Sequence, residues 1–145
     1  MKIVLIQGAF EILNAGHVRT FRRCKAQGDY LIVALNTNEL LKKYKGRDAV
    51  LPWSQKREII SAIRWVDKVV PINTFSPLRL LKKHGVKVYC LSPEWKETKK
   101  AEIAYMKSTG GKVFITRDYM VVRTRQIKKR LLDEALDNQK GPNLC

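Results

Sequence analysis

The sequence predicts one α/β domain built on a five-stranded parallel sheet with helices on both faces. Short β-branched runs alternate with amphipathic helical stretches along the whole chain, which is the pattern of β-α-β units. Each run is continuously apolar, as expected of a strand that is covered on both sides. The chain has 145 residues, a length that suits a single hydrophobic core. We therefore expect residues 1–137 to form one doubly wound domain and residues 138–145 to form a flexible C-terminal tail.

The apolar runs and the helix signals place the individual elements. The expected strands are residues 2–7, 29–35, 67–72, 86–91 and 112–116. The expected helices are residues 17–27, a second helix capped by Ser54, and residues 77–83, 99–108 and 123–136. Residues 36–52 form the longest connection, and their mixture of Asn, Lys, Gly, Arg and Asp predicts that part of this segment is a mobile loop beside the site.

The charge balance is the unusual feature of the composition. Lys and Arg number 29 and Asp and Glu 13, which gives a net charge of +16. The excess is spread along the chain, so the positive field belongs to the folded body and favours an anionic ligand. No apolar run approaches the ~20 residues of a membrane span, and the opening stretch Met1–Gln7 is too short for a signal peptide. We therefore expect a cytoplasmic protein. Cys24, Cys90 and Cys145 have no C-x-x-C spacing and predict neither a disulfide framework nor a zinc site.

The turn after the first strand is the expected ligand site, because doubly wound sheets bind ligands at the carboxyl ends of their strands, where the strand order reverses. Gly8 ends the strand and Gly16 precedes the helix, so both allow close approach to the backbone. His17 stands at a helix start, where free N–H groups and the helix dipole favour a phosphate. The alternative is that His17 is an ordinary polar residue at a helix start.

Residues 8–17, Gly-Ala-Phe-Glu-Ile-Leu-Asn-Ala-Gly-His, resemble the motif G-x-F-D-x-x-H-x-G-H of the cytidylyltransferase branch of nucleotidyltransferases. Glu11 stands in place of the Asp, and Asn14 replaces the first His. Residues 64–67, Arg-Trp-Val-Asp, are similar to a segment of glycerol-3-phosphate cytidylyltransferases. Residues 77–85 and 110–113 are also similar to the heptose-phosphate nucleotidyltransferase domain. The resemblance covers nearly the whole chain and implies a Rossmann-like fold.

The resemblance implies that a nucleotidyl group, CMP rather than AMP, passes from a nucleoside triphosphate to a small phosphorylated alcohol or sugar. The implied cofactor is Mg²⁺ carried mainly by the triphosphate, and no metal-ligating residue is indicated. The implied catalytic residues are His17, Asn14 and Lys45. The residues expected to bind nucleotide are Gly8, Ala9, Phe10, Gly16, His17, Arg64, Asp67, Trp95, Arg123, Thr124 and Arg125. Members of the family are often homodimers, and residues 64–67 would lie near that interface by resemblance.

Three departures from the motifs keep other functions open. Asn14 cannot supply the positive charge of an imidazolium. Residues 122–127 retain only Thr124 of the hydroxyl groups that hold the triphosphate in the family, and residues 92–95 retain Trp95 but lose a glycine and a carboxylate. The chain could therefore be a catalytically impaired relative that binds nucleotide or phosphate, or a basic nucleic-acid-binding module on the same fold. Arg123 and Arg125 could be solvated surface residues, and Trp65 and Trp95 could be packing residues.

Overall fold

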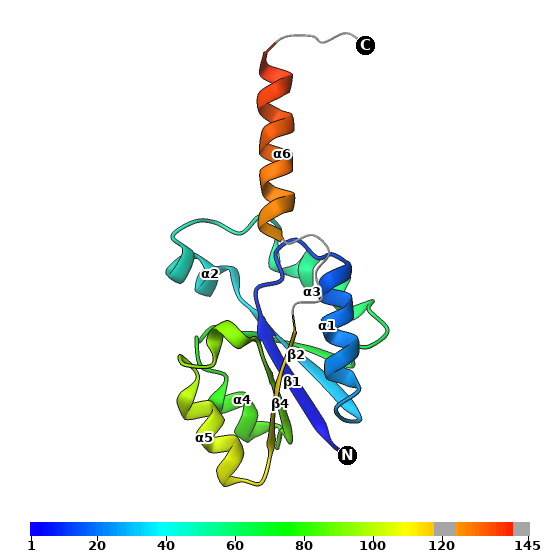
Figure 1. Cartoon of the computed structure of the whole chain (residues 1–145), viewed down its shortest axis with the longest axis vertical. Helices are drawn as coiled ribbons and strands as arrows, with labels where there is room; N and C mark the ends of the chain where they lie inside the picture. The colour runs from blue at the N-terminus through cyan, green and yellow to red at the C-terminus, as the bar shows by residue number, and fades with distance from the viewer. Residues whose placement is uncertain (118–123, 141–145) are drawn as a thin grey trace.

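The computed structural model describes residues 1–117 and 124–140 of the chain. Its centre is a five-stranded, wholly parallel sheet with the strand order β3-β2-β1-β4-β5 (Figure 1). The strands are β1 (Ile3–Gly8), β2 (Tyr30–Asn36), β3 (Lys68–Ile72), β4 (Val88–Leu91) and β5 (Lys112–Ile115). The expected fold class is confirmed, and every expected strand forms with ends that differ by at most two residues.

Helices cover both faces of the sheet. They are α1 (Ala15–Lys25), α2 (Asn38–Lys45), α3 (Trp53–Ser61), α4 (Leu78–Lys83), α5 (Lys100–Ser108) and α6 (Thr124–Gln139), with a short 3₁₀ helix η1 (Pro93–Trp95). Successive strand residues point to opposite faces. Val4 of β1 packs in a cluster with Phe21 of α1, whereas the next residue, Leu5, packs with Leu81 of α4 and Met106 of α5. The continuous apolar runs therefore fill two cores, one on each face.

Part of the connection at residues 36–52 forms a helix, α2, which the sequence analysis did not place. The Thr37 side chain caps the helix by accepting a hydrogen bond from the N–H of Leu40 at 3.2 Å. Leu40 and Leu41 are buried, and Gly46 ends the helix in the left-handed conformation at φ 68°. A single buried Leu-Leu pair anchors this eight-residue helix, which is too little apolar periodicity to be recognised in the sequence.

The start of α3 also differs from the expectation. Pro52 occupies the capping position, Trp53 is the first helical residue, and the helix start has no side-chain hydrogen bond. Ser54 is therefore inside the first turn and does not cap the helix. Proline needs no N–H partner at a helix start, which explains why the helix can begin two residues earlier than the serine predicts.

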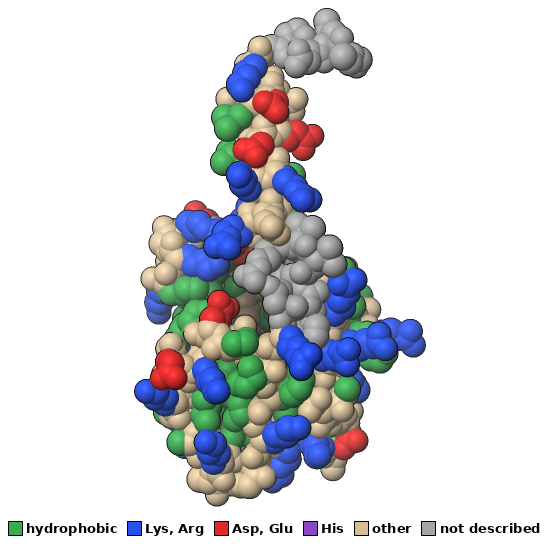
Figure 2. All heavy atoms as spheres, in the orientation of Figure 1, with side chains coloured by type: hydrophobic (Ala, Val, Ile, Leu, Met, Phe, Trp, Pro, Cys, Tyr) green, Lys and Arg blue, Asp and Glu red, His purple; other side chains and the backbone are tan. Residues whose placement is uncertain are grey.

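α6 projects away from the body of the protein (Figure 1). It extends through Gln139, two residues into the segment that was expected to be a tail, and none of its side chains is buried. Figure 2 shows Lys and Arg side chains spread over the visible face of the body, as the charge distribution in the sequence indicates. Among the helices of the described residues, none is long and apolar enough to cross a membrane.

The strand order reverses between β1 and β4. The chain adds β2 and β3 on one side of β1, and then returns to place β4 on the other side. The connections after β1 and β4 therefore leave the sheet in opposite directions and open a crevice at the carboxyl ends of these strands, which is where doubly wound sheets bind ligands.

Asp67 lies at the opposite end of the sheet, directly before β3. Its carboxylate accepts hydrogen bonds from the N–H of Leu31 at 2.7 Å and from Lys25 Nζ at 2.5 Å. Burial alone raises the pKa of Asp67, but the hydrogen bonds from Lys25 and Leu31 outweigh it and bring the pKa below its usual value. The residue ties β2, β3 and α1 together.

Asp67→Ala is expected to lower the free energy of unfolding by about 1–3 kcal/mol at neutral pH, because the N–H of the buried Leu31 loses its charged acceptor. The lowered pKa places this stabilisation above pH ~4, and it disappears as the pH falls through the folded-state value. Urea denaturation at several pH values measures the loss. Asp48→Ala removes an exposed ion pair to Lys42 and is the control. Equal effects of the two substitutions would contradict the structural role of Asp67.

Candidate functional site

A cleft of about 1060 Å³ opens at the carboxyl ends of β1 and β4. Its floor is formed by the last residues of these two strands, and its walls come from α1, the end of α2, the segment before α4, η1 and the first turns of α6. The basic side chains that line it are Lys45, Arg47, Lys99, Arg117, Arg125 and Lys128. The lining contains one carboxylate, that of Glu94, so the cleft among the described residues is strongly positive.

Phe10 shapes the first turn of the cleft. Its backbone has φ 45°, a conformation that non-glycine residues rarely adopt, and its ring contacts the rings of Phe21 and His17 with centroid distances of 5.0 and 5.5 Å. A Cβ at Gly8 would lie 2.6 Å from the Phe10 ring. The absence of a side chain at Gly8 therefore makes room for Phe10, which explains this glycine without an approaching phosphate.

Asn14 and His17 form a reciprocal cap at the start of α1. The Asn14 side-chain oxygen accepts a hydrogen bond from the N–H of Gly16 at 2.9 Å, and the Asn14 backbone N–H donates to His17 Nδ1 at 3.1 Å. The Asn14 amide nitrogen donates to the carbonyl of Ile12 at 3.1 Å. Both ends of the Asn14 amide are thus used within the turn. The free N–H groups expected at this helix start are in part already occupied.

His17 is buried, and burial lowers the pKa of its imidazole to about 4. The ring is therefore neutral near pH 7. Because Nδ1 accepts the hydrogen bond from Asn14, the proton of the neutral ring is on Nε2. His17 lines the cleft, and it can serve there as a neutral hydrogen-bond donor.

Glu11 connects three separate segments around the cleft. Its carboxylate accepts hydrogen bonds from Lys128 Nζ at 2.6 Å, from Arg47 at 3.0 Å and from the N–H of Val50 at 3.0 Å. Only 4% of the residue is exposed. Burial alone raises the pKa of Glu11, but these hydrogen bonds outweigh it and lower the pKa to about 2. The turn after β1, the loop after α2 and the first turns of α6 are held together by one ionised carboxylate.

Two further lysines are buried near the cleft. Lys56 of α3 is fully buried, and its Nζ has no hydrogen-bond partner among the described residues. Lys99 donates to the carbonyl of Phe75, and its Nζ lies 3.8 Å from the centre of the Phe75 ring. Burial lowers the pKa of each, opposed by the negative charge of Glu11 for Lys56 and of Glu102 for Lys99.

One side of the cleft is aromatic. The ring of Phe75 makes edge contacts with Tyr44 and with Trp95, at centroid distances of 6.2 and 5.5 Å. Beside them, Gln7 donates to Asn36 at 2.9 Å, and Asn36 donates to the Tyr44 hydroxyl at 3.4 Å. The buried side-chain oxygen of Gln7 has no partner among the described residues. This side therefore offers flat apolar surfaces to a ligand.

The structure brings together most of the residues that the sequence singled out. Those that line the cleft are Gly8, Ala9, Phe10, His17, Lys45, Trp95, Thr124 and Arg125. Asn14 and Gly16 lie at the start of α1 but are not part of the lining. Arg123 lies outside the described residues.

Arg64 and Asp67 do not reach the cleft. Asp67 precedes β3, whereas the cleft lies beyond the strand ends. Arg64 lies over the Trp65 ring at 5.2 Å, and Trp65 packs against the core. The likeness of residues 64–67 to the family motif therefore reflects the join between α3 and β3 and does not bring these side chains to the nucleotide site expected from it.

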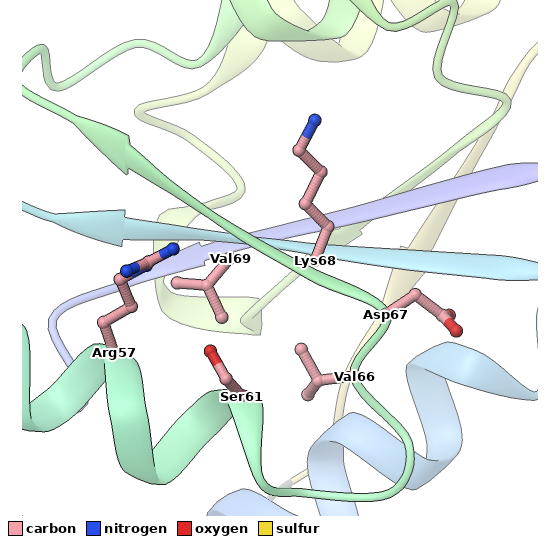
Figure 3. A pocket seen from close by; sticks show the side chains of 6 residues that line it. All are labelled: Arg57, Ser61, Val66, Asp67, Lys68 and Val69. Carbon is pink, nitrogen blue, oxygen red and sulfur yellow. The ribbon is translucent and has the colours of Figure 1, made fainter.

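A smaller hollow of about 240 Å³ lies between α3 and β3 (Figure 3). Val66, Val69 and Ser61 face the space between the two elements, whereas Lys68 and Asp67 point away from it. Arg57 also borders this hollow, which is much smaller than the cleft at the strand ends.

Several cleft residues were missed by sequence reasoning. Arg47, Phe75, Lys99, Arg117 and Lys128 come from five different connections or helix ends. Their positions depend on how distant segments meet at the sheet edge. The one available signal in the sequence was the basic run of Lys128, Lys129 and Arg130. The described residues contain no group of three or more His, Cys, Asp or Glu that could hold a metal ion.

The chain is similar to proteins of one known family. A model of the cytidylyltransferase-like family matches residues 5–133. The glycerol-3-phosphate cytidylyltransferase of Staphylococcus aureus is 32% identical over 117 residues, which cover 77% of this chain and 88% of that protein. The bifunctional protein HldE of Hydrogenovibrio crunogenus is 34% identical over 115 residues, which cover 79% of this chain. The match spans only 24% of HldE, so this chain corresponds to about a quarter of that relative.

A solved structure supports the fold. The lipopolysaccharide core biosynthesis protein from Thermoplasma volcanium superposes with a TM-score of 0.67 at 20% identity, covering 81% of this chain and 98% of that one. Together, the matches confirm the family resemblance noted in residues 8–17.

Glu11→Gln is expected to destabilise the protein by about 1–3 kcal/mol at neutral pH, because Lys128 and Arg47 lose an ionised partner. The folded-state pKa of about 2 lies below the ordinary value of 4.5, so the contribution of Glu11 is complete above pH ~4.5 and is lost as the pH falls toward 2. The difference between wild type and variant should therefore shrink in acid. Urea denaturation from pH 7 to pH 3 measures it. Glu97→Gln, at an exposed ion pair to Lys100, is the matched control. A difference that stays constant in acid would contradict the assignment.

Proposed function

Because the chain belongs to the cytidylyltransferase-like family, we propose that it transfers CMP, in preference to AMP, from a nucleoside triphosphate to a small phosphorylated alcohol or sugar. Family membership supports nucleotidyl transfer in general. The choice of CMP and of this acceptor class takes its support from the names of the relatives and from the cleft. The observation that carries the proposal is a cleft at the strand-order reversal that combines the His17 donor with a ring of cations.

The proposed reaction needs no nucleophile from the protein. An oxygen of the acceptor phosphate attacks the α-phosphorus of the triphosphate and forms a new P–O bond. The bond from the α-phosphorus to the bridging oxygen breaks, and pyrophosphate leaves with the electron pair. The role of the protein is to hold the two phosphates in line and to stabilise charge on the phosphoryl oxygens and the leaving group.

The cleft residues divide this work in the proposal. The His17 Nε2–H donates to a phosphoryl oxygen as a neutral group, whereas Lys45 and Arg125 supply positive charge. Thr124, at the start of α6, offers a hydroxyl group, although its Oγ1 already reaches the carbonyl of Ile12 at 3.4 Å. Asn14 acts by positioning His17, since its backbone holds Nδ1 and its side chain holds the helix start.

Mg²⁺ is part of the proposal as an ion carried by the triphosphate. The donor set of the cleft suits a protein-held Mg²⁺ poorly, because Glu94 is its one lining carboxylate among the described residues. Mg²⁺ held by phosphate oxygens and water would neutralise charge on the leaving pyrophosphate, and no residue role given above depends on it.

The aromatic side of the cleft supports the acceptor and base assignments. The faces of Tyr44 and Phe75 can pack against the C–H groups of a polyol or a sugar. Trp95 offers a flat surface for a nucleobase next to them.

One observation favours a second candidate, a relative that binds the nucleotide but turns over poorly. Both ends of the Asn14 side chain make hydrogen bonds within the turn at the start of α1. Asn14 therefore does not supply the positive charge that an imidazolium would place there. Nucleotide binding without pyrophosphate release, over a broad panel of acceptors, would favour this candidate.

A nucleotide screen followed by a turnover assay tests the proposal. CTP with Mg²⁺ should raise the melting temperature more than ATP with Mg²⁺. Such a shift is measurable, because a ligand at about 100 times its dissociation constant stabilises a protein by roughly 2.7 kcal/mol. Pyrophosphate release should then require glycerol 3-phosphate or a sugar phosphate. Stabilisation by no triphosphate, together with steeply salt-dependent RNA binding, would overturn the proposal in favour of a nucleic-acid-binding module.

His17→Ala should lower turnover by about 100- to 1,000-fold with a smaller effect on nucleotide affinity, because the donor acts on charge that develops during transfer. His84→Ala, at the end of α4, is the control. Since the pKa of His17 is about 4, the wild-type rate between about pH 6 and pH 8 should not follow an imidazole titration. A rate that rises or falls with an apparent pKa near 6.5 in the wild type, and not in His17→Ala, would contradict the neutral-donor role.

A further inference from the structure

Lys56 of α3 is a buried lysine whose amine has no hydrogen-bond partner. The residue is 0% exposed, and its Nζ makes no hydrogen bond among the described residues. Removing an ammonium group from water without a hydrogen bond or an ion pair is costly. An apolar side chain of similar volume would fill the same space without that cost. Packing alone therefore does not explain a lysine at this position.

The Glu11 carboxylate is the negative charge that acts on Lys56. Val50, whose N–H donates to Glu11 Oε1 at 3.0 Å, lies three residues before Trp53, the first residue of α3. The chain that contacts Glu11 therefore runs directly into the first turn of α3, which carries Lys56. The negative charge of Glu11 favours the charged form of Lys56 and so opposes the lowering of the Lys56 pKa by burial.

Glu11 can accept one more hydrogen bond. Both cations that bind it, Lys128 at 2.6 Å and Arg47 at 3.0 Å, contact the same oxygen, Oε2. Among the described residues, the other oxygen, Oε1, accepts a hydrogen bond from the N–H of Val50 alone. An ionised carboxylate offers about four acceptor positions, and a lysine ammonium group has three N–H groups to donate. The free position at Oε1 and the unused N–H groups of Lys56 are therefore complementary.

The two cations that bind Glu11 are also cations that a ligand can reach. Lys128 and Arg47 line the cleft, and their side chains are 29% and 44% exposed. Glu11 and Lys56 are buried and are not part of the lining. An anionic ligand in the cleft therefore competes with Glu11 for Lys128 and Arg47. With both cations turned to the ligand, Glu11 alone would be a buried charge without a counter-ion, which strongly opposes binding.

We propose that Lys56 is a reserve counter-ion, which binds Glu11 Oε1 when a phosphate group of the ligand draws Lys128 and Arg47 into the cleft. The exchange leaves the buried carboxylate with a cation before and after the ligand binds. It also gives the buried ammonium group of Lys56 a partner. Lys56 acts through Glu11 and is a positioning residue. The part of the ligand in this exchange rests on the proposed function, whereas the pairing of Lys56 with Glu11 does not.

Substitution can remove the two cleft cations without a ligand. In a variant with Arg47→Ala and Lys128→Ala, Lys56 should bind Glu11, so this double variant should fold. Lys56→Met keeps the length of the side chain and removes its charge. It should raise the unfolding equilibrium constant at least about tenfold more in the double variant than in wild type, because only there is Lys56 the counter-ion. Lys56→Arg, which keeps the charge, should show no such excess. Urea denaturation at pH 7 measures each constant.

The control is Lys99→Met, at a second buried lysine, which contacts Phe75 and feels the charge of Glu102. It should destabilise wild type and the double variant equally, because its partners are the same in both. An equal cost of Lys56→Met in the two backgrounds would show that Lys56 only packs, and would overturn the proposal.

The sign of a Glu11 substitution separates pairing from packing. Glu11→Gln should destabilise wild type and the double variant, in which the carboxylate has a counter-ion. In the triple variant, which lacks Arg47, Lys128 and Lys56, it should instead stabilise the fold, because the buried carboxylate has no counter-ion left. If the triple variant is unfolded, Glu11→Gln should restore its folded state, which circular dichroism detects. A triple variant that Glu11→Gln does not stabilise would overturn the proposal.

Anion binding tests the exchange itself. Inorganic tripolyphosphate carries phosphates without a base or a reaction, and isothermal titration calorimetry measures its affinity. Lys56→Met should weaken this binding at least about tenfold in wild type and less than about twofold in Glu11→Gln, where no carboxylate loses its counter-ion. Equal weakening in both would show that Lys56 attracts the anion directly, and would overturn the exchange. Absence of tripolyphosphate binding to wild type would contradict the proposed function and the exchange, whereas the stability comparison without ligand would still decide the pairing of Lys56 with Glu11.

Discussion

The Glu11 carboxylate is the interaction on which the shape of the cleft depends. The positively charged side chains of the cleft repel one another, and this repulsion grows as water is excluded. The ionised Glu11 carboxylate offsets this repulsion, because it binds Lys128 and Arg47. It also lies close enough to favour the charged form of buried Lys56. One carboxylate therefore holds together a loop and a helix that have few other contacts. An anionic ligand would supply further negative charge on the open side of the same cations.

The fold could be predicted because its strands are local features. Each strand is a short apolar run that must be covered on both faces, and that requirement leaves little choice beyond a parallel sheet with helices on both sides. The failures occurred where short segments depend on distant partners. α2 is held by two buried leucines and a threonine cap, and α3 begins at a proline that offers no side-chain cap. Thus α2 has too little periodicity to be recognised, whereas α3 was expected and only its start was misplaced.

The candidate site was predictable in its first turn and much less so elsewhere. Gly8, Phe10 and His17 are contiguous with the end of β1, so their place at the sheet edge follows from the strand alone. Phe75, Lys99 and Arg117 reach the same cleft from separate connections, and no spacing in the sequence links them. For Asp67 the opposite happened, because the motif assigned it to the nucleotide site and the structure places it away from the cleft. Likeness to a motif marks a residue as constrained, but its contacts with Leu31 and Lys25 show that the constraint is the join between two strands and a helix.

Asn14 determines which element can carry the positive charge of the site. Its side chain closes the start of α1 with neutral hydrogen bonds, and His17 is neutral as well because it is buried. The charge that faces a phosphate must therefore come from across the cleft, from the end of α2 and the root of α6. Arg125 and Lys128 lie on the first turns of α6. The Glu11 carboxylate binds Lys128 and so holds these first turns against the turn after β1. The position of the two cations over the cleft therefore depends on the same buried carboxylate.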